Sequence, residues 1–298
     1  MICFDKVTEI YCLVDEFCIS FEAQTSSFLI GNKPKRKPTL NTAEVITITL
    51  LFHLSGFRTF KHFYLFYVQK HMTSEFPKTV SYNRFVELMQ GVLLPMTIFA
   101  KTCCLGKCTG ISFVDSTPIR VCKNKRISAN KVFAGLATTG KSTIGWFHGF
   151  KLHIVINDKG EILSFCVTQA NVDDREPLKN ESFLRAVFGK LYGDKGYISK
   201  KLQELLFIDG IHLVTSIRNN MKNSLMTMAD KILLRKRSVI ETVNDELKNI
   251  CQVEHSRHRS FANFVANLVS GIIAYSFLPK KPSIKYSTIK NAQLALFY

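Results

Sequence analysis

The stretch KLYGDKGYISKKL, residues 190–202, reads as a short apolar strand, a turn and the beginning of a helix. Asp194 stands directly after the apolar part, and Lys195, Gly196 and Tyr197 follow it. A carboxylate at the tip of a buried strand is poorly placed for core packing, but it is well placed to bind something at the edge of a sheet. The stretch therefore predicts an α/β fold with a binding site at a strand end.

Flanking segments extend this pattern into a mixed sheet with helices on its faces. Two runs rich in β-branched residues are joined by Lys159-Gly160, which indicates a hairpin. We expect strands at 111–115, 150–158, 161–169, 190–194 and 211–217, and helices at 175–189, 199–208 and 237–250. The uncharged run 261–278 has its apolar residues at helical spacing, and its Asn and Ser residues favour a buried helix over a membrane span.

Residues 1 to about 108 are expected to be helical and basic. Helices are predicted over 1–30, with Val7, Ile10, Leu13, Val14 and Phe17 inward; from Ala43, capped by Thr42; and over 81–93. Between the first two lies GNKPKRKPTLN, residues 31–41, whose two prolines exclude a continuous helix. Its cations Lys33, Lys35, Arg36 and Lys37 form either a solvated linker or an arm that lies along phosphates, and we favour the arm.

The overall charge favours a polyanionic partner. The 298 residues include 40 Lys and Arg against 23 Asp and Glu, so the net charge is +17. Apolar residues make up 46% of the chain, which excludes a disordered protein. Nucleic acid is the first expected partner and an anionic membrane the second. The nine scattered cysteines are expected to be reduced thiols, and CCLGKC at 103–108 lacks the second ligand pair of a typical zinc site.

Three acids are candidates for one site. Asp115 follows the run ISFV, Asp194 follows LYG, and Glu241 lies beside the helical stripe formed by Ile240, Val243, Leu247 and Ile250; Glu246 is expected to face solvent. Carboxylates that meet at a strand end repel one another, and a divalent cation with oxygen ligands removes that penalty. Mg²⁺ suits such a site, and two ions would serve an in-line phosphoryl displacement.

Four segments in this order carry a resemblance to bacterial insertion-sequence transposases of the DDE type. They are FVDSTPIRV (113–121), WFHGFKLHIVINDKGEIL (146–163), TQANVDDREPL (168–178) and YGDKGYISKKL (192–202). Arg237, Glu241 and Lys248 add the pattern R-x3-E-x6-K of the third acid in these enzymes. Nearly the whole chain is similar to the insertion-sequence family numbered nine-eight-two, although Leu234 stands where related families often carry Tyr.

The resemblance implies a ribonuclease-H-like mixed sheet flanked by helices, with an all-helical N-terminal domain. Residues 1–108 would be the DNA-binding region, 109–278 the catalytic domain and 279–298 a basic tail. Asp115, Asp194 and Glu241 would be the catalytic and metal-binding acids, with two Mg²⁺ or Mn²⁺ ions, and Arg237 and Lys248 would meet phosphates. The partner would be double-stranded DNA, the active form a homo-oligomer without membrane contact, and the location the bacterial cytoplasm at the nucleoid.

The sequence leaves alternative functions and alternative roles of single residues open. The chain could be a Mg²⁺-dependent nuclease that joins no strands, or a DNA-binding protein whose catalytic role is lost. Asp194 could be a plain turn residue. One of Asp173 and Asp174 is expected to cap the following helix rather than to bind metal. His148 and Lys151 are interpreted as DNA contacts or as residues of an edge position.

Overall fold

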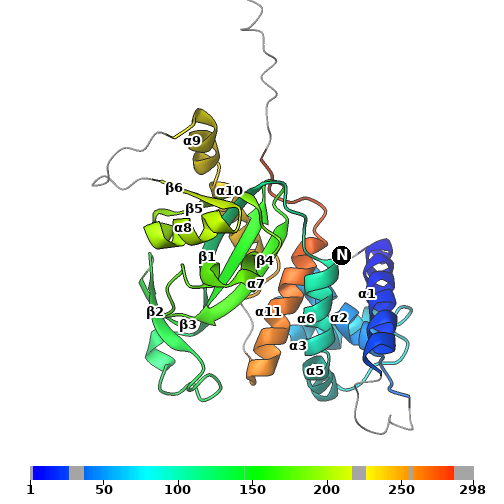
Figure 1. Cartoon of the computed structure of the whole chain (residues 1–298). Coiled ribbons are helices and arrows are strands. Elements are labelled where there is room, and N and C mark those ends of the chain that lie inside the picture. Colours follow the sequence, from blue (N-terminus) through cyan, green and yellow to red (C-terminus); the bar gives the residue numbers. More distant parts are fainter. Residues whose placement is uncertain (1–2, 27–36, 144, 217–225, 255–257, 285–298) are drawn as a thin grey trace, which may run out of the picture.

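The computed structural model describes residues 3–26, 37–143, 145–216, 226–254 and 258–284. A six-stranded mixed sheet lies on one side of the molecule, and the N-terminal helices lie on the other side (Figure 1). Helix α11 (Phe261–Ser276) stands between the two parts.

The sheet combines parallel and antiparallel pairs. Strand β1 (Ile111–Cys122) is central, pairing in parallel with β5 (Gly189–Gly193), which pairs in parallel with β6 (Ile211–Thr215). On its other edge β1 pairs antiparallel with β3 (Gly145–Asn157). The outer edge of β3 carries β2 (Thr138–Ser142) along 145–149 and β4 (Ile162–Gln169) along 150–156. The order and directions are compatible with a ribonuclease-H-like core.

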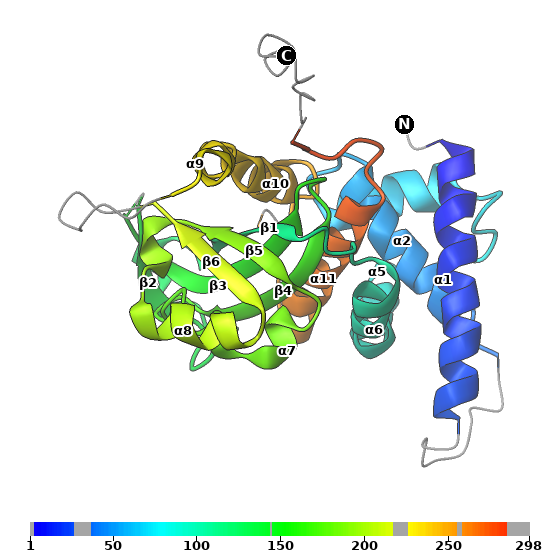
Figure 2. The same ribbon diagram turned by 45° about the horizontal axis from the view of Figure 1, so that its top comes forward.

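Helices cover both faces of this sheet (Figure 2). On one face, α10 (Ser238–Asn249) and α11 share a core with β1 and β3, built around Phe113, Ile154, Ile240 and Phe264. On the other face, α7 (Glu181–Leu184) and α8 (Lys200–Ile208) pack around Val114, Val155, Leu191 and Leu202. Helix α9 (Met228–Arg235) leads into α10. Alternate residues of β1 thus enter different cores, as the two-residue period of a strand requires.

The N-terminal part is helical, as predicted. It comprises α1 (Phe4–Thr25), α2 (Thr42–Leu54), α3 (Phe60–His62), the π-helix η1 (Phe63–Val68), α4 (Gln69–His71), α5 (Tyr82–Gly91) and α6 (Leu93–Cys103). These helices share one core, to which α11 adds Ala266, Val269 and Ile273. Because the opposite side of α11 enters the core of the sheet, this helix joins both parts.

A buried histidine of the N-terminal part forms hydrogen bonds to α11 and to the chain after α10. His53 of α2 contacts the Cys251 carbonyl oxygen through Nδ1 at 2.5 Å and the Ser270 hydroxyl through Nε2 at 2.7 Å. Burial lowers the pKa of His53 to about 4, so the ring is neutral near pH 7. The side chain of a residue larger than Gly271 would meet Val253, so α11 approaches the chain after α10 closely at this point.

Several expectations need correction. Strand β1 does not end at Asp115 but continues to Cys122, because its second half pairs with β3. The helix predicted over 175–189 is reduced to the 3-10 turn η3 (Pro177–Lys179) and α7, since Arg185 ends α7 and the chain turns back toward β5. The cap of α2 is Asn41, which exchanges hydrogen bonds with Glu44 in a capping box, rather than Thr42.

Smaller errors concern single side chains. Leu13 is 45% exposed, because the described elements leave that side of α1 uncovered, and Ile250 is 46% exposed, because the helix ends there. Glu246, expected to face solvent, is only partly exposed, and burial raises its pKa. The other helices and strands predicted for the sheet region were found where they were expected, within a few residues.

Candidate functional site

Parallel pairing sets the first two acids side by side. Phe113 of β1 pairs with Tyr192 of β5, and their rings stack with centroids 5.4 Å apart. Counting two residues further along each strand reaches Asp115 and Asp194. Because neighbouring strands lie about 4.8 Å apart and side chains two residues apart share a face, this register directs both carboxylates to the face covered by α10.

The turn after β5 explains the motif around Asp194. The Asp194 carboxylate accepts a hydrogen bond from the Lys195 backbone N–H at 2.6 Å and caps the turn η4 (Lys195–Tyr197). A Cβ atom on Gly193 would lie 3.1 Å from the Tyr197 ring and 3.3 Å from Val114, so glycine lets this buried ring pack over the strand end. Asp194 is exposed, so its carboxylate caps the turn at the solvent-accessible edge of the site.

The third acid lies on a polar stripe of α10. Arg237, Glu241, Asn244 and Lys248 follow one another at intervals of three or four residues, which places them along one side of the helix. The buried side chains Ile240, Val243 and Leu247 hold that helix against the sheet. The pattern R-x3-E-x6-K thus corresponds to a line of side chains that runs along β1.

Two members of the stripe contact Asp115. The Arg237 guanidinium lies 2.8 Å from Glu241 Oε1 and 3.9 Å from Asp115 Oδ1, so one cation stands between the two acids. The amide of Asn244 donates to Asp115 Oδ2 at 3.1 Å. Sequence reasoning missed Asn244, although its spacing of three residues from Glu241 and four from Lys248 would have placed it on the same side of the helix.

Asp115 is held in an unfavourable electrostatic environment. The pKa of Asp115 is raised to about 6: burial is the main cause, and the negative charges of Glu241 and Asp194 add to it, while Arg237 and the Ser116 N–H act in the opposite direction. The charge of Asp115 is therefore coupled to both other acids. The contacts of Asp115 with Arg237 and Asn244 connect β1 to α10, and the strand pairing places the end of β5 beside them.

The chemistry of these donors fits a hard divalent cation. Besides the carboxylates, Asn244 Oδ1 is buried and has no hydrogen-bond partner among the described residues. Carboxylate and amide oxygens are the ligands that Mg²⁺ prefers, and a cation would offset both the burial and the neighbouring negative charges that raise the pKa of Asp115. Within the described ranges no three acidic, His or Cys side chains are already gathered closely enough to hold a metal ion, and Arg237 supplies the positive charge.

Lys248 supports the strand that carries Asp115. Its ammonium group donates to the Pro118 carbonyl oxygen at 2.7 Å and pairs with Glu254 at 3.4 Å. Glu254 in turn accepts from the Arg120 N–H at 3.0 Å. These bonds fix the middle of β1 against α10, so Lys248 has a structural contact in addition to any phosphate contact expected from its sequence pattern.

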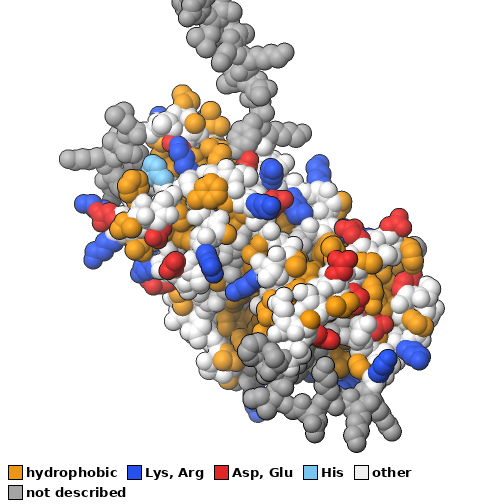
Figure 3. All heavy atoms as spheres, turned by 45° about the vertical axis from the view of Figure 1, so that its right-hand side comes forward, with side chains coloured by type: hydrophobic (Ala, Val, Ile, Leu, Met, Phe, Trp, Pro, Cys, Tyr) orange, Lys and Arg blue, Asp and Glu red, His pale blue; other side chains and the backbone are white. Residues whose placement is uncertain are grey.

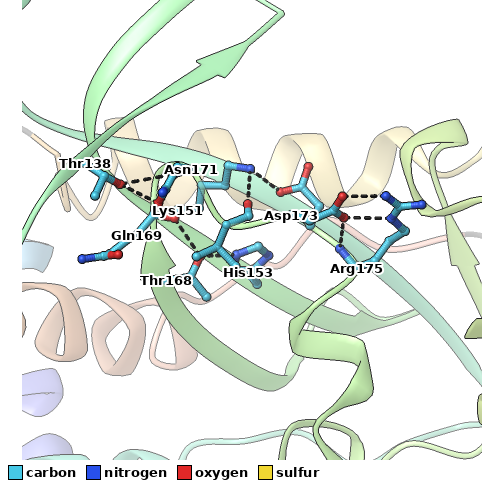
Figure 4. Close-up of polar contacts among 10 residues, drawn as sticks. Thr138, Lys151, His153, Thr168, Gln169, Asn171, Asp173 and Arg175 are labelled. Atoms are coloured by element: carbon cyan, nitrogen blue, oxygen red, sulfur yellow. Dashed lines mark hydrogen bonds and ion pairs between the residues drawn. The ribbon is translucent and has the colours of Figure 1, made fainter.

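The acids after β4 have partners of their own, on the other face of the sheet (Figure 4). Asp174 pairs with Lys151 at 2.9 Å, and Lys151 also donates to the Val172 carbonyl oxygen. Asp173 binds Arg175, whose guanidinium hydrogen bond lowers the pKa of Asp173. Asp173 also accepts from the Arg175 N–H, which fixes the turn before η3. His148 is 8% exposed and bonds Thr139 across β2 and β3.

The basic character of the N-terminal part is uneven. Lys33, Lys35 and Arg36 lie outside the described residues, and Lys37 is exposed. Figure 3 brings the side of α1 forward and shows acidic side chains among apolar ones there. Helix α1 carries one lysine against five acids: Asp5, Glu9, Asp15, Glu16 and Glu22. Its outer side therefore repels phosphates. No helix in the described ranges is long and apolar enough to cross a membrane.

A family model matches more than half of the chain. Residues 105–261, which are 157 of the 298 residues, match the family model described as a transposase DDE domain. The matched range contains β1, the end of β5 and α10, and with them all three acids. A search of curated proteins finds no match.

Proposed function

Because the chain belongs to the transposase DDE domain family, we propose that it is a DNA transposase. It would cut DNA at the terminal inverted repeats of an insertion sequence and join the freed 3′-OH ends to target DNA. Within the family we assign it to the insertion-sequence group numbered nine-eight-two, on the motifs that it shares with that group. The observation that carries the proposal is the placement of three acids from separate elements: the Arg237 guanidinium lies between Asp115 and Glu241, and the pairing of Phe113 with Tyr192 brings Asp194 to the same sheet edge as Asp115.

We propose that Asp115, Asp194 and Glu241 hold Mg²⁺, with Asn244 as a neighbouring oxygen donor. Two such ions would polarise the scissile phosphate and stabilise the attacking and leaving oxygens. The role of the protein is then to hold a negatively charged phosphate beside negatively charged side chains. Arg237 suits that task because its guanidinium already lies between two of the acids and has a buried Nη1 without a hydrogen-bond partner among the described residues.

Other parts of the chain would bind and position DNA. We propose that residues 1–108 recognise the terminal repeats, with Lys33, Lys35, Arg36 and Lys37 along phosphates and Lys248 near the phosphates at the site. The outer side of α1 is excluded from this contact by its acids. The active complex would be a homo-oligomer, since two element ends must be handled together.

The substitution Asp194→Asn tests this function. Asparagine is at least as suitable for the turn as aspartate, but it cannot supply the negative charge that a metal site needs. In Mg²⁺ the variant should lose both end cleavage and strand joining while retaining DNA binding. Asp209→Asn, at the exposed end of α8, removes the same charge elsewhere and serves as the matched control.

Labelled DNA from both flanks of the encoding gene is the substrate, with a precut 3′-OH end as a second substrate. Cleavage without joining of the precut end would identify a nuclease. Binding with neither reaction, in wild type as in the variant, would identify a DNA-binding protein without catalysis. An Asp194→Asn variant that cuts at the wild-type rate would refute the site.

A further inference from the structure

A groove lies at the far end of β1 from the acids. It is lined by Ile119–Cys122 of β1, by residues 123–126 and 129–133 of the loop toward β2, and by Gly145 and Trp146 at the beginning of β3. Val253, Glu254 and His258 after α10 and Phe264 of α11 complete the lining. Its volume is about 1230 Å³, above the ~300–1,000 Å³ of a typical small-molecule pocket. In Figure 1 this end of β2 and β3 is turned away from the N-terminal helices.

The groove is strongly basic. Its lining includes five exposed cations, namely Arg120, Lys123, Lys125, Arg126 and Lys131. Glu254 is the one acid among the described lining residues, and it is engaged by Lys248 and the Arg120 N–H. This excess of positive charge within one groove complements the negative charge of a phosphate backbone.

An exposed indole stands at the edge of this groove. Trp146, the only tryptophan of the chain, is 62% exposed, although tryptophan is a residue that usually buries most of its surface. Its carbonyl oxygen accepts from Asn124 at 3.0 Å, which ties the loop to β3 and holds the backbone beneath the ring. Lys141 lies 6.0 Å from the ring centroid. The ring is thus presented beside the cations rather than packed in a core.

We propose that this groove binds a single DNA strand, with its phosphates on the cations and an unpaired base stacked on Trp146. A positively charged groove with an aromatic platform is the arrangement that single-strand binding requires. A base inside a duplex is stacked on both sides and offers no face to the indole, whereas an unpaired base does. The inference rests on the proposed function, since it names the form of DNA that the enzyme holds beside its site.

The strand β1 sets the distance between groove and acids. From Asp115 to Cys122 the strand advances seven residues, or about 23 Å at ~3.3 Å per residue. At ~3.4 Å per nucleotide along one strand, this spans roughly seven nucleotides. The DNA strand in the groove would therefore be unpaired from its complement at a point about seven nucleotides from the phosphate at the acids.

Binding is measured in EDTA, so that no cleavage interferes. Because Trp146 is the only tryptophan, protein fluorescence reports directly on the ring. A 15-nucleotide single strand should quench this fluorescence, whereas the same sequence fully paired inside a longer blunt-ended duplex should not. Trp146→Ala should weaken single-strand binding about 5- to 150-fold, measured by anisotropy of labelled DNA, and Trp146→Phe should restore part of it.

The cations are tested by the salt dependence of binding. Replacing Lys123, Lys125 and Arg126 by Ala should lower the slope of log K against log salt by about 2, at ~0.7 per phosphate on a single strand. The matched control replaces Lys179, Lys200 and Lys201, exposed cations of η3 and α8 on the other face of the sheet. The control variant loses the same net charge as the test variant, so any weakening of its single-strand binding should come from net charge alone.

Equal quenching by the fully paired duplex, or unchanged single-strand affinity of Trp146→Ala, would overturn the inference. So would quenching by anionic vesicles or by polyglutamate without quenching by DNA, since each would give the groove a different partner. These outcomes are independent of the proposed function, because they require no catalysis. A wild type that binds the single strand through Trp146 but neither cuts nor joins DNA would refute the transposase and leave the groove intact.

Discussion

Replacing Asp115 by Asn should make the protein more stable at neutral pH while it removes the proposed activity. The carboxylate is mostly buried, with 23% of the side chain exposed, and it lies within the influence of Glu241 and Asp194. Asparagine has the same shape and can still accept from Asn244 through its carbonyl oxygen. The substitution therefore removes the charge and leaves the packing unchanged.

The size of the effect follows from the pKa. The environment of Asp115 raises its pKa from 3.8 to about 6, a shift of roughly two. At about 1.4 kcal/mol per pKa unit, the ionised form is less stable in the fold by about 3 kcal/mol than it is in the unfolded chain. This sum already contains the favourable effect of Arg237. We therefore expect Asp115→Asn to gain up to about 3 kcal/mol in free energy of unfolding at pH 7.

The sign of the pH dependence is fixed by the same shift. Between pH 4 and pH 6 the folded wild type binds the proton of Asp115 more tightly than the unfolded chain does, so its stability falls as pH rises through this window. The amide that replaces the carboxylate in Asp115→Asn does not titrate. The gain should be near zero at pH 4, grow between pH 4 and pH 6, and stay constant above pH 7.

Urea unfolding at several pH values between 4 and 8, with EDTA present, measures this difference. His53, His153 and His258, whose pKa values burial lowers to about 4, also titrate in the window, but they are common to both proteins and cancel. Asp209→Asn controls for the loss of one negative charge from a chain of net charge +17. A gain that does not change with pH, or a destabilised variant at pH 7, would contradict the raised pKa that burial and the neighbouring acids give Asp115.

Two further substitutions address the cations. Arg237→Met removes the charge between Asp115 and Glu241, so it should destabilise the fold by about 1–3 kcal/mol at pH 7 and by less at pH 4, measured by the same urea series; equal losses at both pH values would contradict this electrostatic role. Replacing Lys33, Lys35, Arg36 and Lys37 by Ala should weaken duplex DNA binding on all sequences and lower the salt slope by about 0.9 per lost contact. An unchanged slope would make the segment a linker.

The sequence predicted the parts of the site that depend on local pattern. Asp194 could be placed because a short apolar strand and a capped turn are readable within a few residues. Helix α10 could be placed because its apolar residues Ile240, Val243 and Leu247 recur at helical spacing. The parallel pairing of β1 with β5, on which the neighbourhood of Asp115 and Asp194 depends, was expected only through the resemblance, since the strands are far apart in the chain.

Other features could not be read from pattern. Strand β1 continues past Asp115 because β3 pairs with it, and a run containing Asp, Ser, Thr and Pro carries no local signal of a long strand. Beyond Phe113 the strand pairs with β3 alone, so Pro118, which has no N–H, lies where β1 has an edge without a partner strand among the described residues. The groove was missed for the same reason: its lining comes from β1, a loop, β3 and residues after α10, which only the tertiary fold brings together.

The continuity of β1 links these findings. Asp115 lies near one end of the strand, Pro118 is bonded by Lys248 in its middle, and residues 119–122 line the basic groove at its other end. Strand β1 pairs with β3 without interruption from Ser112 to Arg120, and a register irregularity follows before Cys122, so the ladder holds the distance from Asp115 to the beginning of the groove. Gly149 of β3 secures this pairing, because a Cβ atom there would meet the Ile119 carbonyl oxygen. A DNA strand held by both ends of β1 would thus be presented to the acids at a constant offset, which is what cutting at a defined position requires.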